Sequence, residues 1–466
     1  MVRLRISIVG AGYVGLTSAV CYADRGFNVY LLESDRAKAQ QIKVEEPPFY
    51  EAGLREMLHE ALASGKLEVS SDVKKAVLGS EITFIAVGTP SLSDGSIDLT
   101  HVGSAAKDIG KTLKIKGDYH LVVVRSTVTP GTTLNFVKPS LESSSGKRVG
   151  VEVGLAMQPE FLKEGSAIQD TFNPSRVVIG EYDSKSGDTL ESFCRKLHGE
   201  NVPPILRMNP TSAEVVKYAS NAFLATKVSF INQIANICEK VEGVDVVKVA
   251  DAMGLDDRIG RKFLNAGPGF GGSCFPKDLK ALVAFSRELG YEPKLLEATL
   301  RINEEQANHV AELVREELGS VKEKKIAVLG LAFKPDTDDM RESQSIRIIN
   351  RLMEEGAEVQ AYDPAAMKNA RELFGEKILY ADSATNCLSG ADCAVIVTEW
   401  DEFKKLNVED FKRKMRTPIV VDTRRIYNPQ EFRSLRYRAV GLKESAYTDE
   451  DERKVKERLR SLGYLG

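Results

Sequence analysis

The sequence has few of the residues that hold proteins together covalently or through metals. Six cysteines are scattered over 466 residues without a CxxC pair, and five histidines lie apart from one another. This spacing argues against a disulfide framework and a zinc site, and favours a reducing cytoplasm. No apolar run approaches the roughly 20 residues of a membrane span. The first expected strand begins at residue 4, so we expect no signal peptide.

A strong charge of one sign is also lacking. The formal net charge is −3, with 28% charged and 42% hydrophobic residues, which is typical of a soluble globular protein. This balance gives no electrostatic reason to expect nucleic acid or an anionic membrane as a partner. A chain of 466 residues exceeds one ordinary core, so we expect two or three domains.

The first residues carry a dinucleotide-binding pattern. An apolar strand at 4–9 runs into GAGYVG at 10–15, a helical stretch follows, and a second strand ends in Glu33. The glycines allow a tight turn, a close pyrophosphate and helix packing on the strand, while the acid can hold the adenosine ribose. An acid there favours NAD, although Ser34 and Arg36 leave NADP open.

A second motif places a cysteine beside a helix start. Residues 269–278 read GFGGSCFPKD, and a helix-forming run from Lys277 stops at Gly290. Pro276 suits the first helical position, so Cys274 would lie beside exposed backbone N–H groups at the positive end of a helix dipole. These surroundings favour a thiolate nucleophile over a buried structural cysteine, and the loop glycines would leave room for a substrate.

The N-terminal third alternates strand and helix. Strand candidates lie at 82–87, 121–125, 151–157 and 176–179. Repeated βα units with polar turns predict a mostly parallel sheet, with ligands at the carboxyl ends of the strands.

A long helix is expected next. Residues 211–214 read TSAE, which predicts a capping box, and neither Pro nor Gly follows until Gly243. About 30 helical residues span roughly 45 Å, more than a small domain needs. The helix is expected to form a two-domain spine and dimer core, with an inter-domain strut as the alternative.

The α/β pattern then returns. Residues 326–363 repeat the strand, glycine, strand and acid order of residues 6–33, without GxGxxG. This second Rossmann-like unit is therefore expected to bind something other than NAD. Lys334 and Arg341 are its candidate anion contacts, or alternatively members of surface ion pairs.

Together these motifs resemble the UDP-glucose/GDP-mannose dehydrogenase family over nearly the whole chain. The cysteine motif is the most specific part of the likeness. The resemblance implies an α/β fold of two Rossmann-like domains joined by a long central helix. The implied domains are an NAD-binding domain (1–204), a central helical domain with the cysteine loop (205–305) and a nucleotide-sugar (UDP) binding domain (306–466). The supporting motifs lie at 87–90, 125–127, 159–165, 217–223, 332–334, 340–343, 398–400 and 422–425.

The resemblance implies a four-electron oxidation of a sugar C6 alcohol to a carboxylate, with two NAD⁺ used in succession. Cys274 would form a thiohemiacetal and then a thioester. The chemistry agrees, because a bare aldehyde does not readily lose hydride. The implied substrate is UDP-glucose, with GDP-mannose and UDP-N-acetylmannosamine as alternatives. A two-electron β-hydroxyacid-type dehydrogenase and a non-catalytic nucleotide-binding module are further alternatives.

Residue roles follow from the same resemblance. Lys217 and Asn221 lie four apart, on one helical face, and can stabilise oxyanions. Thr127 and Asp278 would position and deprotonate water, and Glu160 would assist thioester hydrolysis. The implied cofactor contacts are Gly10, Gly12, Tyr13, Val14, Gly15, Glu33, Lys38, Thr89, Thr127, Glu164, Cys274, Lys277 and Arg341. The implied substrate contacts are Glu160, Phe161, Leu162, Lys217, Asn221, Arg258, Phe263, Leu264, Asn265, Gly271, Phe275, Phe333, Lys334 and Arg424.

Two of these expectations concern geometry. Glu160 and Glu164 would lie one helical turn apart if the segment after Pro159 is helical. Arg258 matches a family arginine that reaches the sugar site of the partner subunit, so the implied active site is completed in a homodimer.

Overall fold

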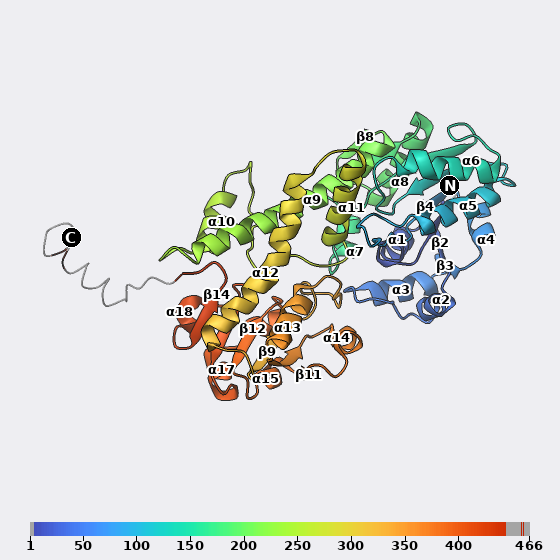
Figure 1. Cartoon of the computed structure of the whole chain (residues 1–466). Coiled ribbons are helices and arrows are strands. Elements are labelled where there is room, and N and C mark those ends of the chain that lie inside the picture. Colours follow the sequence, from blue (N-terminus) through green and yellow to red (C-terminus); the bar gives the residue numbers. More distant parts are fainter. Residues whose placement is uncertain (1–3, 444–457, 459, 461–466) are drawn as a thin grey trace. The chain divides into compact units, whose positions relative to one another are not determined.

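The computed structural model describes residues 4–443, 458 and 460, and divides into two compact units (Figure 1). The first unit contains residues up to 222, with 277–293 and 336–338, and the second contains the remainder. Helix α9 (Pro210–Cys238) has 29 residues and continues from the first unit into the second. Two Rossmann-like sheets and this helix confirm the predicted fold class.

The first unit is built on an eight-stranded sheet in the order β3-β2-β1-β4-β5-β6-β7-β8, in which β6 and β7 pair antiparallel and the other neighbours pair parallel. Along β5, Leu121 and Val123 enter one apolar core while Val122 and Val124 enter another. Both faces of the sheet are therefore covered, as expected for parallel strands. The strands are β1 (Arg5–Val9), β2 (Asn28–Leu32), β3 (Leu67–Ser70), β4 (Ile82–Ile85), β5 (His120–Val124), β6 (Val153–Met157), β7 (Val177–Glu181) and β8 (Ile205–Met208).

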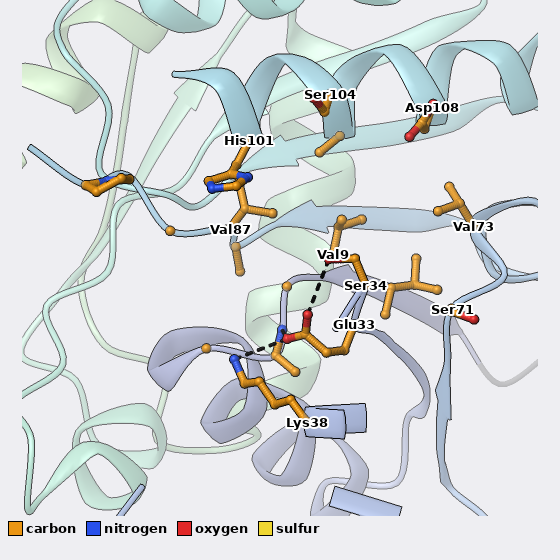
Figure 2. A pocket seen from close by; sticks show the side chains of 18 residues that line it. Val9, Glu33, Ser34, Lys38, Ser71, Val73, Val87, His101, Ser104 and Asp108 are labelled. Carbon is orange, nitrogen blue, oxygen red and sulfur yellow. Dashed lines mark hydrogen bonds and ion pairs between the residues drawn. The ribbon is translucent and has the colours of Figure 1, made fainter. Parts of the chain in front are cut away.

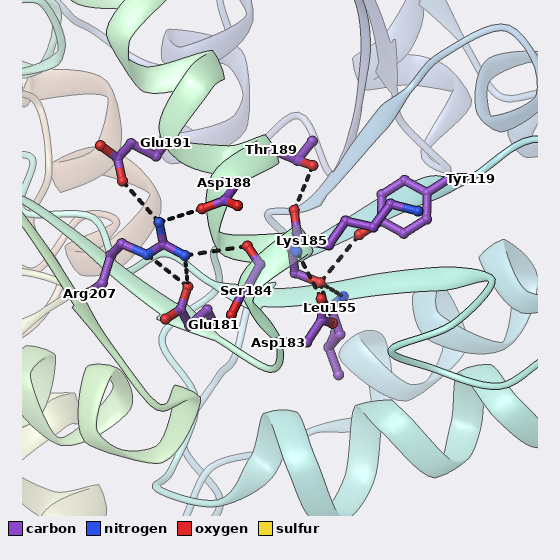
Figure 3. A network of polar contacts seen from close by, with 11 residues as sticks. Tyr119, Leu155, Glu181, Asp183, Ser184, Lys185, Asp188, Thr189, Glu191 and Arg207 are labelled. Atoms are coloured by element: carbon purple, nitrogen blue, oxygen red, sulfur yellow. Dashed lines mark hydrogen bonds and ion pairs between the residues drawn. The ribbon is translucent and has the colours of Figure 1, made fainter.

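The edge strand β8 is held by ion pairs of Arg207 (Figure 3). Its guanidinium contacts Glu181 on β7 and Asp188 and Glu191 on α8. A Cβ on Gly187 would collide with the Glu181 carboxylate, so glycine leaves space for this network. Charged groups on an edge strand also oppose pairing with another chain. The helices of this unit are α1 (Tyr13–Asp24), α2 (Arg36–Lys43), α3 (Leu54–Ala63), α4 (Val73–Leu78), α5 (Thr100–Leu113), η1 (Thr133–Val137), α6 (Lys138–Ser145), α7 (Ala167–Phe172), α8 (Ser184–His198) and most of α11 (Phe275–Glu288).

The predicted capping box at 211–214 is wrong. The Oδ1 atom of Asn209 caps α9 by accepting a hydrogen bond from the Ser212 amide (2.8 Å). Glu214 is fully buried and accepts from the amide (2.8 Å) and the hydroxyl (2.6 Å) of Thr133. Tertiary partners therefore take the carboxylate that the local pattern assigns to the helix start.

The second unit has a six-stranded parallel sheet in the order β11-β10-β9-β12-β13-β14, which repeats the order of the first six strands of the first unit. The repeat extends to the turn after the first strand. Gly10 and Gly330 both have a φ of 102°, and their amides donate to the carbonyl oxygens of Leu32 (2.8 Å) and Tyr362 (2.9 Å). The strands are β9 (Lys325–Leu329), β10 (Glu358–Tyr362), β11 (Leu379–Tyr380), β12 (Cys393–Ile396), β13 (Ile419–Asp422) and β14 (Arg436–Ala439).

The helices of the second unit share one apolar core with its sheet. In the described part of the chain, no helix is long and apolar enough to cross a membrane. These helices are α10 (Val246–Gly254), α12 (Lys294–Leu318), α13 (Gln344–Glu354), α14 (Met367–Phe374), α15 (Ala384–Cys387), α16 (Asp401–Lys404), α17 (Val408–Lys414) and α18 (Pro429–Phe432).

Candidate active site

Three glycines shape the turn between β1 and α1. A Cβ on Gly10 would lie 2.7 Å from the Ala86 carbonyl oxygen, and one on Gly15 would lie 1.8 Å from the Gly10 oxygen. A Cβ on Gly12 would meet no atom within 4 Å, and no side chain caps α1 there. Gly10 and Gly15 are therefore needed by the fold, whereas Gly12 leaves open backbone at a helix N-terminus, where a pyrophosphate fits.

The carboxylate of Glu33 is engaged at the end of β2. Its Oε1 accepts from the Asp35 amide (3.0 Å), while Oε2 accepts from the Ala11 amide (3.3 Å) and pairs with Lys38 Nζ (3.1 Å). Burial raises the pKa of Glu33, but the Asp35 amide and the Lys38 ammonium outweigh it, so the pKa lies below its usual value. The carboxylate thus stays ionised, as ribose binding requires.

A pocket of about 440 Å³ lies beside this turn (Figure 2). Glu33 and Lys38 line one side, and a face of α5 with His101, Ser104 and Asp108 lines the other. The volume lies in the range of small-molecule sites. The sequence reasoning missed the three α5 residues, although their i, i+3, i+7 spacing marks one helix face.

Thr89, Thr127 and Tyr13 were predicted to contact the cofactor. The Thr89 hydroxyl, after β4, donates to the carbonyl oxygen of Thr127, after β5 (2.9 Å). The Tyr13 hydroxyl donates to Glu51, which also accepts from the Gly165 amide (2.6 Å). Burial and Glu51 raise the pKa of Tyr13, so the hydroxyl stays protonated. Glu51 therefore connects α1 to the segment after β6 through hydrogen bonds, a role that the sequence did not reveal.

Lys217 and Glu160 form a buried ion pair in the first unit. Lys217 Nζ on α9 lies 2.9 Å from Glu160 Oε1, and the two side chains are 4% and 6% exposed. Glu160 also accepts from the Leu162 amide (2.6 Å), and the Phe161 ring lies 5.6 Å from Lys217 Nζ. Burial raises the pKa of Glu160, but the Lys217 ammonium more than offsets this, so the pKa is lowered and the pair is charged.

A second buried polar cluster lies one turn further along α9. Asn221 Nδ2 donates to Asp278 Oδ2 (2.6 Å), and Lys277 Nζ lies 2.6 Å from Asp278 Oδ1. The structure therefore brings predicted residues from α9 and α11 together. Amide and ammonium donors fix the orientation of the Asp278 carboxylate.

The segment that carries Glu160 and Glu164 is not helical, so the expected one-turn relation between them is wrong. Helix α7 begins only at Ala167. Both glutamates are nevertheless buried, at 7% and 8% exposure, and Glu164 accepts from the Thr337 hydroxyl (3.3 Å). Tertiary contacts hold these carboxylates, and they are not solvated surface groups.

Cys274, in the second unit, directly precedes α11, as predicted. It is partly exposed, whereas the other five cysteines of the chain are buried. Burial raises the pKa of the thiols of Cys21, Cys194 and Cys387 to about 12. Cys274 is therefore the cysteine that a substrate can reach.

The loop glycines before Cys274 pack against protein atoms. A Cβ on Gly271 would lie 2.4 Å from the Glu342 carbonyl oxygen, and one on Gly272 would lie 2.8 Å from the Phe333 ring. Packing therefore requires glycine at both positions, and the expectation that these glycines also leave room for a substrate stays a prediction. They serve the packing of the loop on the following Rossmann-like domain, in which Phe333 and Glu342 lie.

Several predicted substrate contacts gather in the second unit. The rings of Phe263 and Phe275 lie 6.0 Å apart, and Lys334 Nζ lies 6.0 Å from the Phe333 ring centroid. Arg424 Nη2 donates to the Phe333 carbonyl oxygen (3.3 Å). Aromatic rings with a lysine and an arginine suit a base and a phosphate.

Other predicted contacts differ in their exposure and partners. Arg258 is 89% exposed in its side chain and pairs with Asp256 (2.6 Å). Arg341 pairs with Asp339 (2.7 Å), which is the surface ion pair considered as its alternative. The remaining predicted residues are exposed Asn265, buried Leu264 and Val14, which packs against the core of the first unit.

In the second Rossmann-like unit, the acid after the second strand is hydrogen-bonded to the turn that follows β9. Asp363 follows β10 as Glu33 follows β2, but it accepts from the amides of Leu331 (2.7 Å) and Ala332 (3.0 Å) and from the Trp400 indole (3.0 Å). The donors that a pyrophosphate would use are occupied. This supports the expectation that the unit binds something other than NAD.

Three family models match the chain in succession. They describe the NAD binding domain (4–198), the central domain (211–305) and the UDP binding domain (327–429) of one dehydrogenase family. The chain belongs to the UDP-glucose/GDP-mannose dehydrogenase family. Its NAD-binding domain has the glycine-rich turn with open backbone at Gly12, and Glu33 follows the next strand. These residues fit NAD, which is the cofactor.

Relatives match this dehydrogenase along nearly their whole length. It is 45% identical to the UDP-glucose 6-dehydrogenase AglM of Haloferax volcanii, covering 92% of this chain and 98% of the relative. It is 42% identical to the UDP-glucose 6-dehydrogenase TuaD of Bacillus subtilis, covering 93% and 92%.

Solved structures agree with the family assignment. The UDP-glucose dehydrogenase of Pyrobaculum islandicum superposes with a TM-score of 0.87 at 40% identity, covering 94% of this chain and 98% of the other. The UDP-D-ManNAc dehydrogenase of Pyrococcus horikoshii superposes with a TM-score of 0.83 at 29% identity, covering 94% and 99%. The chain is thus an NAD-dependent dehydrogenase of nucleotide sugars.

Proposed function

We propose that the chain oxidises UDP-glucose to UDP-glucuronate, consuming two NAD⁺ and one water and releasing two NADH. The observation that carries the proposal is the accessible Cys274 directly before α11, in a chain that also has an NAD-binding and a UDP-binding domain. The relatives named above as UDP-glucose 6-dehydrogenases support this sugar over GDP-mannose and UDP-N-acetylmannosamine.

The chemistry divides between the cofactor and the cysteine. NAD⁺ held at the turn between β1 and α1 would supply the hydride acceptor for each of the two oxidations. The Cys274 thiolate adds to the aldehyde to form a thiohemiacetal, and loss of hydride from that carbon gives a thioester. Water then releases the carboxylate and regenerates the thiol. A two-electron β-hydroxyacid-type dehydrogenase needs neither this cysteine nor the UDP-binding domain.

The buried groups of the first unit suit the proton and charge steps. Lys217 and Asn221 present an ammonium and an amide on one face of α9, where they can stabilise the oxyanions of the reaction. Asp278 and Thr127 are assigned to the hydrolytic water, and Glu160 to thioester hydrolysis. Glu160 supplies the counter-charge of the Lys217 ammonium, since the two form a buried ion pair.

Counting the products tests this proposal. The chain should release two NADH per UDP-glucose consumed, and it should prefer UDP-glucose in a panel with GDP-mannose and UDP-N-acetylmannosamine. Cys274→Ser should bind UDP-glucose and lose steady-state formation of the acid, because an alkoxide is harder to generate than a thiolate. Cys194→Ser, in a buried site, is the matched control. One NADH per sugar, or unchanged turnover of Cys274→Ser, would contradict the mechanism.

We further propose the domain assignment of 1–204 for NAD, 205–305 for the central helical domain and 306–466 for the nucleotide sugar. The three matched family models support this order.

We also propose a cytoplasmic location, since none of the six cysteines forms a disulfide.

The proposed assembly is a homodimer through α9. Phe223, Phe230 and Ile237 are exposed and seven residues apart, so they form one apolar stripe on this helix. A second copy of the chain would cover the stripe and place Arg258 near the partner's sugar site. Phe230→Asp should convert a dimer into a monomer in light scattering. A monomeric mass for the unmodified chain with full activity would contradict the assembly.

A further inference from the structure

The ribose end of the dinucleotide pocket holds a cation beside the acid that selects NAD. Lys38 Nζ lies 3.1 Å from Glu33 Oε2, and both residues line the pocket (Figure 2). Lys38 belongs to the first turn of α2, and its side chain is 30% exposed. The ammonium is therefore within reach of a ligand but is held by the carboxylate.

Other groups around this pair also suit a phosphate. Ser34 lines the pocket, and its hydroxyl lies 3.5 Å from Glu33 Oε1. Arg36 is exposed and opens α2. A hydroxyl and an ammonium gathered near one carboxylate form an anion site whose centre is occupied by the side chain of Glu33.

We propose that Glu33 excludes NADP in two ways: its charge repels the 2′-phosphate, and it holds Lys38, the residue that would otherwise bind that phosphate. Lys38 is thus a specificity-determining residue, and removal of the Glu33 charge creates a 2′-phosphate subsite of Lys38 and Ser34. The proposal rests on the NAD site of the proposed function and adds the identity of the latent phosphate ligand.

Formation of the subsite requires that Lys38 changes its partner rather than its position. In Glu33→Gln the amide keeps one oxygen for the Ala11 or Asp35 amide, so the turn can persist. The ammonium loses its counter-charge and becomes available. A charge-assisted contact to phosphate strengthens binding by roughly 10- to 100-fold.

Binding of two small probes to the full chain tests the subsite without turnover. Adenosine 5′-monophosphate and adenosine 2′,5′-bisphosphate differ only by the phosphate on the ribose 2′ oxygen, and calorimetry gives both dissociation constants. Glu33→Gln should shift the ratio roughly 10- to 100-fold toward the bisphosphate. The double variant Glu33→Gln/Lys38→Met should lose that gain, and Lys43→Met, outside the pocket, should leave the ratio unchanged.

Kinetics with both cofactors give a second reading. In the Glu33→Gln background, Lys38→Met should lower kcat/KM for NADP⁺ more than for NAD⁺. Equal loss with both cofactors, or a bisphosphate gain that survives in the double variant, would overturn the role of Lys38. UDP-glucose oxidation by the unmodified chain with NAD⁺ is measured separately, so failure of the subsite is distinguishable from failure of the proposed function.

Discussion

Replacement of Gly12 by alanine separates cofactor binding from folding. Gly12 has φ −73° and ψ −170°, which alanine adopts, and its Cβ would meet no atom within 4 Å. Glycine-to-alanine changes at compatible sites stabilise by about 0.4–1 kcal/mol, and the poorer helix cap offsets part of this. The free energy of unfolding should therefore change by less than about 1 kcal/mol, which corresponds to less than about 4 °C in Tm.

NAD binding by Gly12→Ala should fall sharply. The added methyl group lies at the helix N-terminus where the pyrophosphate approaches the backbone. Each hydrogen bond to a charged group that is lost costs about 1.5–3 kcal/mol, or roughly 10- to 150-fold in Kd. The structure thus predicts a folded chain that binds NAD poorly.

Gly15→Ala is the matched comparison, because it should damage the fold itself. The new Cβ would lie 1.8 Å from the Gly10 oxygen, so α1 would have to move by more than 1 Å from β1. Such overpacking costs about 1–3 kcal/mol or more. Thermal unfolding and calorimetric NAD titration of both variants provide the test. If Gly12→Ala binds NAD as tightly as the unmodified chain, or Gly15→Ala melts at the same temperature, the assigned glycine roles are wrong.

Two further predictions concern buried charges of the first unit. Glu160→Gln leaves the Lys217 ammonium without a counter-charge and should lower the free energy of unfolding by about 3–5 kcal/mol. Adding Lys217→Met should restore much of the Tm without restoring NADH release. A Glu160→Gln variant as stable as the unmodified chain would contradict the ion pair. Burial, followed by the Lys116 ammonium, lowers the pKa of His120 to about 3, against about 6.5 in an unfolded chain. The contribution of neutral His120 to the free energy of unfolding is fully present above pH 6.5. It is lost as the pH falls toward 3, by up to about 1.4 kcal/mol per pH unit. The Tm difference between the unmodified chain and His120→Gln should narrow over that range, and a constant difference would refute this.

The parts of the fold and site that the sequence predicted correctly depend on residues that are close together in the chain. The fingerprint turn, its acid and the helix after Cys274 each lie within a short contiguous stretch, so local spacing carries the geometry. Lys217 and Asn221 could be placed on one helix face because they lie four residues apart in the same helix. The repeated strand order was also visible, since the two Rossmann-like patterns follow the same succession.

The errors arose where distant residues decide the outcome. The capping box failed because Glu214 binds Thr133, which lies 81 residues away in the chain. The packing role of the glycines before Cys274 was missed because Phe333 and Glu342, which lie against them, come much later in the sequence. Glu51 was missed because its three donors, the Tyr13 hydroxyl and the amides of Gly165 and Ala167, are tertiary neighbours.

Asp363 gives the second Rossmann-like unit an internal hydrogen-bond acceptor at the turn after β9. Its carboxylate takes the amides of Leu331 and Ala332, as a bound phosphate would. In the equivalent turn of the first unit, Glu33 accepts from the Ala11 amide but the backbone at Gly12 stays open, so bound NAD adds contacts there and raises the stability of that unit by mass action. Added NAD should therefore raise the unfolding temperature of the first unit and leave that of the second unit unchanged.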